Sequence, residues 1–313
     1  MKIFVSGSLA YDRIMDFPGK FADHILPDKI HILNVCFMIN GLAEKFGGTA
    51  GNIAYNLALL EEKALILAAV GKDFDTYENW LSKHSLPMTG IRRIDSEFTA
   101  GAYITTDQAD NQITCFNPGA MKYPSLYNFA DENPADTIAI VSPGNFDDML
   151  GFSRFYKEHK IPCIFDPGQQ IPVLSKDQML EMISGAKILI VNDYELQMIE
   201  KATDRTRGEL LELTKTLIVT LGEKGSLVCQ GDQEIPIAAT RARQVVDPTG
   251  AGDAYRAGLI KGLLAQKDLT VAAQMGATAA SFNVECYGTQ EHHFTMAEFL
   301  DRYQENFTVT LKL

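Results

Sequence analysis

The chain passes from an apolar segment into a helical one at Val246-Asp247-Pro248-Thr249-Gly250-Ala251-Gly252-Asp253-Ala254-Tyr255. The proline biases the residue before it toward an extended conformation, and the glycines let the backbone approach a ligand closely. A helix that begins at such a turn directs unpaired amide hydrogens and the positive end of its dipole toward the turn. The stretch therefore predicts a binding site for an anion, and phosphate is the anion expected first.

Asp253 is the unusual residue of this stretch, because its negative charge lies in a turn that favours anions. One interpretation is that Asp253 caps the helix, as acidic residues of a first turn often do. The other is that Asp253 is a general base, which removes the proton of a hydroxyl group as that group attacks a phosphoryl group. In the second case the amides of Gly250, Ala251 and Gly252 stabilise charge on the transferred group.

The composition bounds the class of protein. The chain has 313 residues, of which 46% are hydrophobic and 22% charged, as in one globular α/β body. A net charge of −12 disfavours nucleic acids and acidic membranes as partners. No apolar run approaches the ~20 residues that span a bilayer, and no signal peptide is recognisable. Five cysteines without metal-ligand spacing suit a reducing compartment, so we expect a cytoplasmic protein.

Apolar strands alternate with helical segments over most of the chain. This alternation predicts an α/β fold with a mostly parallel sheet that helices cover on both faces. The expected strands are residues 3–5, 65–71, 137–141, 163–165, 188–191 and 217–220, with a hairpin at 226–229 and 234–237. The expected helices are residues 53–60, 152–159, 176–183 and 271–282, with a further helix after the anion turn.

A second region departs from this alternation. Residues 102–106 and 112–116 flank a polar turn, Asp107 to Asn111, and predict a β-hairpin. Residues 30–35 and 36–39 are expected to be extended pieces of the same small element. We expect a small β-sheet lid that shuts water out of the site. The expected division is a large domain of residues 1–12, 46–95 and 122–313 and a lid of residues 13–45 and 96–121.

Polar side chains follow several of the predicted strands, at the sheet edge where ligands bind in open α/β folds. Asp12 lies just beyond the first strand, as an acceptor for substrate hydroxyls or as a solvated turn residue. The glycine-rich loop Phe46 to Asn52 opens a helix, and Asn52 either binds a polyol or caps the turn. Asp166 ends the strand 163–165.

The pair Asn192 and Glu195 follows the strand 188–191 with a spacing that places both on one side of a first helical turn. The pair either caps the helix or holds Mg²⁺ through water molecules. Thr220 and Gly222 suit contacts to a nucleotide. Neither this loop nor the anion turn has the spacing of a P-loop or of a dinucleotide fingerprint, so both of those architectures are disfavoured.

Together these motifs resemble those of the ribokinase-like (PfkB-type) sugar and nucleoside kinases. Residues 247–253 resemble the C-terminal signature of that family, and residues 47–52 resemble its N-terminal glycine loop. Asn192-x-x-Glu195 is similar to its magnesium-associated motif, and Thr220-x-Gly222 to its nucleotide contact. The resemblance implies a three-layer α/β/α sandwich with a small β-sheet lid, and an ATP-dependent kinase with an alcohol as acceptor.

The resemblance also implies a role for each motif. It implies Asp253 as the base and the amides of Gly250, Ala251 and Gly252 as the anion hole. The residues expected to bind the acceptor are Asp12, Gly48, Asn52, Phe116 and Gln170. Those expected to bind ATP are Asn192, Thr220, Gly222, Gly250, Gly252 and Asn283. Mg²⁺ is expected near Glu195 and Asn192, through water, and the K⁺ that many members use is expected near Asp247, Thr249 and Gly288.

Three stretches direct the expected acceptor toward adenosine. Asp166-Pro167-Gly168-Gln169-Gln170 is similar to a motif of bacterial adenosine kinases, and residues 117–121 and 285–291 point the same way. An aromatic residue such as Phe116 suits stacking on a base. Phosphorylation of adenosine to AMP is the first hypothesis, a kinase for ribose or a hexose derivative the second, and a noncatalytic nucleoside or nucleotide sensor the third. We expect a monomer or a homodimer.

Overall fold

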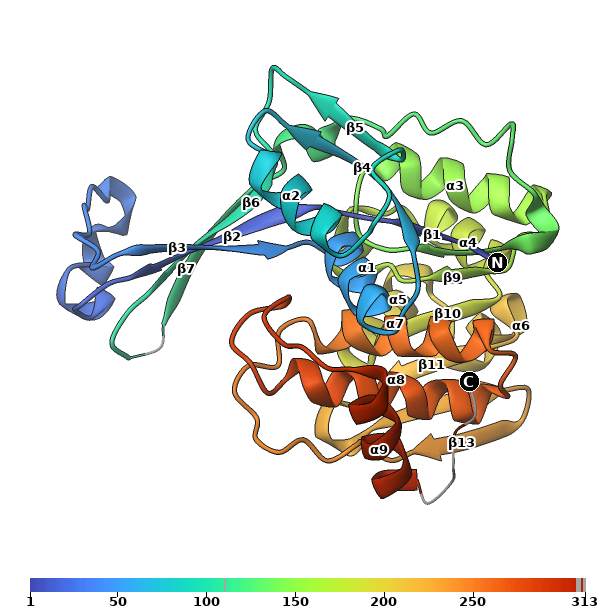
Figure 1. Cartoon of the computed structure of the whole chain (residues 1–313). Helices are drawn as coiled ribbons and strands as arrows, with labels where there is room; N and C mark the ends of the chain where they lie inside the picture. Colours follow the sequence, from blue (N-terminus) through green and yellow to red (C-terminus); the bar gives the residue numbers. More distant parts are fainter. Residues whose placement is uncertain (110, 308–310, 312–313) are drawn as a thin grey trace.

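The computed structural model of the chain describes residues 1–109, 111–307 and 311 (Figure 1). The strands are β1 (Lys2–Ser6), β2 (Ala10–Asp16), β3 (Leu42–Gly47), β4 (Ala64–Gly71), β5 (Ile91–Ile94), β6 (Ala100–Thr106), β7 (Gln112–Asn117), β8 (Thr137–Val141), β9 (Cys163–Phe165), β10 (Ile188–Asn192), β11 (Leu217–Thr220), β12 (Ser226–Gln230) and β13 (Gln233–Ile237). Within the described residues they form a nine-stranded large sheet, in the order β13-β12-β11-β10-β9-β8-β1-β4-β5, and a four-stranded small sheet, in the order β3-β2-β6-β7.

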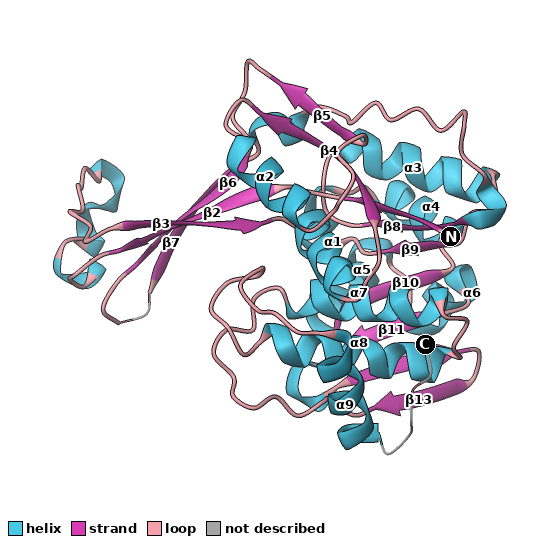
Figure 2. Ribbon diagram, in the orientation of Figure 1, coloured by secondary structure: helices cyan, strands magenta, loops and turns pink. Residues whose placement is uncertain are grey.

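Helices cover both faces of the large sheet (Figure 2). They are α1 (Thr49–Leu59), α2 (Asp75–Lys83), α3 (Phe146–Glu158), α4 (Lys176–Gly185), α5 (Asp193–Thr203), α6 (Arg207–Thr214), α7 (Ala251–Leu264), α8 (Leu269–Asn283) and α9 (Met296–Phe307). No helix among the described residues has both the length and the apolar character needed to cross a bilayer. The fold is the three-layer α/β/α sandwich with a separate small β-sheet that the resemblance implied.

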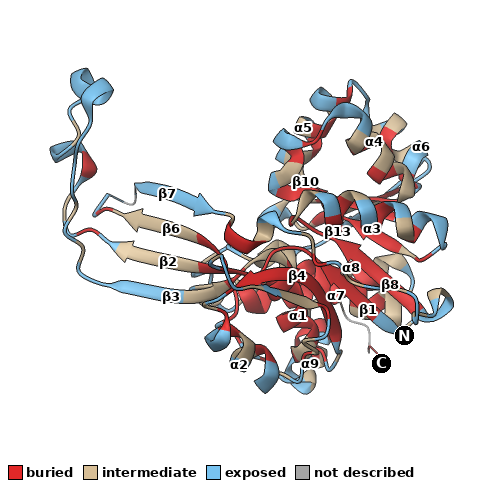
Figure 3. Cartoon of the chain, turned by 90° about the horizontal axis from the view of Figure 1, so that it is seen from above, coloured by how far each residue is buried: buried red, intermediate tan, exposed pale blue. Residues whose placement is uncertain are grey.

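The core has two apolar layers, one on each side of the large sheet. In β1, Ile3 and Val5 belong to the layer under α1, α7 and α8, whereas Phe4 belongs to the layer under α3 and α4. Successive side chains of a strand point to opposite faces, so a strand that is buried on both faces is continuously apolar. Figure 3 shows these strands as the buried interior of the molecule. The parallel pairing from β5 to β11 follows from the same pattern.

The small sheet projects away from the large one (Figure 1). β2 pairs with β3 in antiparallel and with β6 in parallel orientation, and β6 forms the expected hairpin with β7. The predicted turn of that hairpin includes Asp110, which lies outside the described residues. The small sheet includes residues 10–12 and 46–47, so its strands extend past the expected lid segments toward the large sheet.

Three local expectations were wrong. Residues 30–39 are not extended strands: Pro27–Ile32 is a 3-10 helix, and Ile30, Ile32 and Met38 are exposed without a strand to pair with. Asp12 does not follow β1 but lies inside β2 of the small sheet. The helix expected at 152–159 is α3, which begins at Phe146 because the side chain of Asn145 caps it.

The contact between α7 and α8 generates a prediction about stability. A Cβ atom on Gly258 of α7 would lie 2.4 Å from the carbonyl oxygen of Met275 in α8. We expect Gly258→Ala to lower the free energy of unfolding by about 1–3 kcal/mol, because the helices must separate to admit the methyl group. The measurement is the midpoint and slope of urea unfolding.

Gly151 of α3 is the matched control, since it is exposed and a Cβ atom there meets nothing within 4 Å. Gly151→Ala is expected to raise the free energy of unfolding by about 0.5–1 kcal/mol, because alanine loses less backbone entropy in a helix. Equal effects of the two substitutions would contradict the close approach of α7 to α8.

Candidate active site

A cavity of about 540 Å³ lies where the small sheet meets the carboxyl ends of the large sheet's strands. The small sheet contributes Asp12, Ala102 and Phe116 to its lining. The residues from the rest of the molecule include Gly48, Asn52, Asp166, Gln170, Asn192, Glu195, Thr220, Gly222, Thr249, Gly250, Gly252, Asp253 and Arg256. The volume is that of a pocket for a small molecule.

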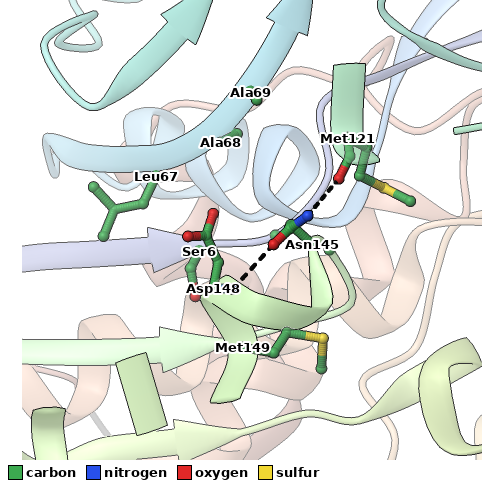
Figure 4. A pocket seen from close by; sticks show the side chains of 10 residues that line it. Ser6, Leu67, Ala68, Ala69, Met121, Asn145, Asp148 and Met149 are labelled. Atoms are coloured by element: carbon green, nitrogen blue, oxygen red, sulfur yellow. Dashed lines mark hydrogen bonds between the residues drawn. The ribbon is translucent and has the colours of Figure 1, made fainter. Parts of the chain in front are cut away.

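A second hollow lies between β1, β4 and α3 and is shown in Figure 4. Its volume is about 10 Å³, which is the space of a single water molecule. Asn145 closes it by donating to the carbonyl oxygen of Met121 at 3.0 Å and accepting from the amide of Asp148 at 3.1 Å. This hollow is therefore part of the packing, and the larger cavity is the candidate active site.

The anion turn forms one wall of the large cavity. Gly250 is the N-cap residue of α7 and has a φ of +81°, which residues with a side chain rarely adopt. α7 therefore begins at the cavity, with its first amides and its dipole directed toward it. Gly48 also lines the cavity and precedes α1 with a φ of +88°, and a Cβ there would lie 2.6 Å from the carbonyl oxygen of Ser8.

Asp253 lies in the first turn of α7, at the floor of the cavity. Its Oδ2 accepts a hydrogen bond from Nδ2 of Asn52 at 2.8 Å. The scarcity of water around it raises the pKa of Asp253 to about 6, although the charge of Arg256 and the hydrogen bond from Asn52 act in the opposite direction. A carboxylate with a pKa near neutrality is suited to accept a proton during a reaction.

The structure adds Arg256, which the sequence analysis did not select. Arg256 is buried one helical turn after Asp253, and its Nε lies 2.6 Å from Oδ2 of Asp166. Burial raises the pKa of Asp166, and the guanidinium opposes that rise by favouring the carboxylate. An arginine on the apolar face of a helix that opens with an anion turn is the signal by which the sequence could have revealed it.

The residues predicted to bind the acceptor all line the cavity. Asp12 makes no hydrogen bond with any described residue, and burial and the charge of Asp247 raise its pKa to about 6. Phe116 is 52% exposed and presents its ring to the cavity. Gln170 donates to the carbonyl oxygen of Gly144 at 3.1 Å, which leaves its own amide oxygen free to accept.

Asn192 and Glu195 line the cavity and also cap α5. The side chain of Asn192 accepts from the amide of Glu195, and the side chain of Glu195 accepts from the amide of Asn192. The second carboxylate oxygen of Glu195 makes no hydrogen bond within the described part of the chain. Thr220 is the last residue of β11, which pairs with β10, and it lines the cavity. Gly222 also lines the cavity, and it has no side chain to separate the backbone from a ligand.

Four predicted site residues do not line the cavity: Ala251, Asp247, Asn283 and Gly288. Asp247 accepts from the amides of Thr249 at 2.9 Å and Gly288 at 3.0 Å, so it ties the loop after α8 to the anion turn. Both oxygens of the Asp247 carboxylate thus accept amide hydrogens, and the K⁺ expected near Asp247, Thr249 and Gly288 stays a prediction. Asn283 is fully buried and packs behind Gly250.

The buried ion pair generates a second prediction. Arg256→Met removes the cation beside Asp166, and we expect the free energy of unfolding to fall by about 3–5 kcal/mol, because a buried carboxylate is left unpaired. The matched control is Arg154→Met, which breaks an ion pair with Glu181 on the exposed face of α3. Urea unfolding should show the control close to the wild type, and equal losses would contradict the burial of the Arg256 pair.

Comparison with known proteins agrees with this geometry. The pattern of the pfkB family carbohydrate kinases matches residues 37–295. A nucleoside kinase of Methanocaldococcus jannaschii is 32% identical over 275 residues, which cover 87% of this chain and 90% of that protein. The structure of Burkholderia thailandensis nucleoside kinase in complex with inosine has a TM-score of 0.87 and 34% identity, over 99% of this chain and 100% of that chain.

The structure of a ribokinase from Thermotoga maritima has the same fold as this chain, with a TM-score of 0.81 and 20% identity. The resemblance deduced from the motifs is confirmed, because the family pattern and the relatives both extend over most of the chain. The chain belongs to the pfkB family of carbohydrate kinases and is an ATP-dependent kinase that acts on a hydroxyl group.

Proposed function

We propose that this kinase phosphorylates the 5′-hydroxyl of a ribonucleoside and that adenosine, converted to AMP, is its preferred acceptor. The observation that carries the proposal is the position of Asp253, between the anion turn and a cavity that also contains Asp12 and Phe116. The similarity to nucleoside kinases supports a nucleoside as acceptor. The motif Asp166–Gln170, similar to that of adenosine kinases, supports the choice of adenosine.

The acceptor side of the cavity suits the two parts of a nucleoside. The unpaired carboxylate of Asp12 accepts hydrogen bonds from ribose hydroxyls, which are donors of the right polarity. The exposed ring of Phe116 stacks on the base. Gln170, from the rest of the molecule, lines the same cavity and offers an amide oxygen. The small sheet, which carries Asp12 and Phe116, acts as a lid that limits the access of water to the site.

Phosphoryl transfer then proceeds as an in-line displacement. Asp253 accepts the proton of the 5′-hydroxyl while the oxygen of that hydroxyl forms a bond to the γ-phosphorus of ATP. The bond between that phosphorus and the bridging β,γ-oxygen breaks, and ADP leaves with the electron pair. The amides at the start of α7 stabilise the negative charge on the phosphoryl group as it is transferred. Thr220 and Gly222 line the same cavity, which supports their proposed role as nucleotide contacts.

The cavity also contains groups that fit a Mg²⁺ ion. One oxygen of Glu195 is free of hydrogen bonds, and Oδ1 of Asp166 is buried with no hydrogen-bond partner among the described residues. The described residues contain no cluster of three or more His, Cys, Asp or Glu side chains suited to a metal. Mg²⁺ keeps much of its hydration and needs few protein ligands, so Glu195, Asn192 and Asp166 suit an ion that they would bind through water. The ion would neutralise charge on the triphosphate.

The role of Asp253 leads to a third prediction. We expect Asp253→Asn to lower kcat by ~10² or more, because the amide cannot take the proton of the attacking hydroxyl. Affinity for ATP should change little, since the amides of the anion turn remain in place. Steady-state kinetics and nucleotide titration check the two halves separately. Near-normal turnover in this variant would remove Asp253 from its role as base.

The acceptor is tested with a panel of compounds and ADP release as the readout. We expect turnover with adenosine and inosine to exceed turnover with ribose or a hexose by about 10² or more in kcat/KM, because sugars lack the base that Phe116 contacts. Phe116→Ala should reduce turnover of nucleosides more than turnover of ribose. Turnover with ribose alone would show a sugar kinase, and no turnover with any acceptor would indicate a sensor.

A further inference from the structure

A chain of hydrogen bonds leads from Trp80 to the cavity. Nε1 of Trp80 donates to Oε1 of Gln290 at 2.9 Å. Nε2 of Gln290 donates to Oδ1 of Asn52 at 3.0 Å, and Nδ2 of Asn52 donates to Oδ2 of Asp253 at 2.8 Å. Gln290 is 2% exposed and Asn52 is 5% exposed, so the bond between these two amides is shielded from water. The chain joins α2, the loop after α8, α1 and α7.

The orientation of Gln290 is determined by its neighbours. The indole N–H of Trp80 is a donor only, so the oxygen of the Gln290 amide must face it. Tyr77 donates its hydroxyl proton to the carbonyl oxygen of Gly47 at 2.9 Å. Its oxygen therefore accepts from Nε2 of Gln290, at 2.6 Å. Two independent contacts thus place the nitrogen of Gln290 toward Asn52.

The orientation of Asn52 follows from that of Gln290. Because Gln290 donates to Oδ1 of Asn52, that oxygen faces away from Asp253 and Nδ2 faces toward it. An N–H donor favours the ionised form of a carboxylate, whereas an amide oxygen in the same place would favour the protonated form. Only the ionised carboxylate of Asp253 accepts a proton from a hydroxyl group.

We infer that Gln290 and Trp80, with Tyr77, are positioning residues of this enzyme, which orient the amide of Asn52 so that it holds the base Asp253 ionised and aimed at the acceptor. This inference rests on the proposed role of Asp253. It also gives a reason for Gly51: a Cβ atom there would lie 2.0 Å from the hydroxyl oxygen of Tyr77. The indole is in turn held by stacking on Phe46 and Tyr55.

Other charges also act on Asp253 and must stay constant in a test. Arg256 of α7 lowers its pKa, and Glu195 of α5 raises it. Asp166, after β9, and the hydroxyl of Tyr77, in α2, also interact electrostatically with it. Neutral substitutions at Gln290 and Trp80 leave all four groups in place, so a change in the titration of Asp253 reports on the hydrogen-bond chain.

The experiment measures kcat and KM against pH for the whole protein, with ATP and adenosine. In the wild type, kcat should fall as the pH drops through about 6, where Asp253 becomes protonated. In Gln290→Met we expect this acidic limb to move upward by about one pH unit, so that kcat falls about 2-fold at pH 7 and about 5-fold at pH 6, with an unchanged KM for ATP. Trp80→Phe should shift the limb in the same direction by less, because Tyr77 still orients Gln290.

Gln274→Met is the matched control, since it also removes a glutamine that is hydrogen-bonded to a tyrosine, Tyr303, at 2.7 Å, and neither residue lines the cavity. In the control, the acidic limb of kcat against pH should stay at its wild-type position, even where thermal unfolding shows a loss of stability. If Gln290→Met fails to fold, Trp80→Phe carries the test. Wild-type limbs in both variants, while Asp253→Asn is inactive, would overturn the inference and leave the proposed function standing.

Discussion

The central constraint is the presence of a carboxylate at a helix N-terminus to which the proposed function also assigns the binding of phosphate. Asp253 is in the first turn of α7, where unpaired amides and the helix dipole favour negative charge. The same position would repel a triphosphate if the carboxylate pointed into the phosphate path. Asn52 holds the side chain from one side and Arg256 provides a nearby positive charge, so both functions fit into one turn.

The other acidic residues of the cavity add negative charge near Arg256. Asp166 and Asp253 both interact electrostatically with Arg256, and Glu195 adds a third negative charge. Breaking a buried pair costs far more than forming it contributes, because a charge that has left water needs a partner. An enzyme that gathers several carboxylates where a triphosphate must bind therefore needs a permanent cation, and arginine remains protonated under all physiological conditions.

The architecture brings distant segments to this turn. The parallel strands β8 to β11 deliver their carboxyl ends, with Asp166, Asn192 and Thr220, to one edge of the large sheet. The small sheet crosses that edge and adds Asp12 and Phe116. In the proposed function, phosphate chemistry belongs to the large sheet and α7, whereas recognition of the acceptor belongs largely to the small sheet. This division lets the acceptor differ among kinases of one fold.

The sequence by itself determined the fold class, the series of strands and helices, and the four motifs. The signals for them are the periodicity of apolar residues, the glycine turns and the i, i+3 spacing of polar residues, and each of these acts over a few residues. It could not place the 30–39 segment, where apolar residues without a partner strand remain exposed. The partners of Asp253 needed the tertiary structure. Asn52, Arg256, Gln290 and Trp80 come from separate parts of the chain, and their contacts with one another depend on side-chain directions in a packed interior. Local pattern carries no information on such contacts, so only the fold decided how the base is held.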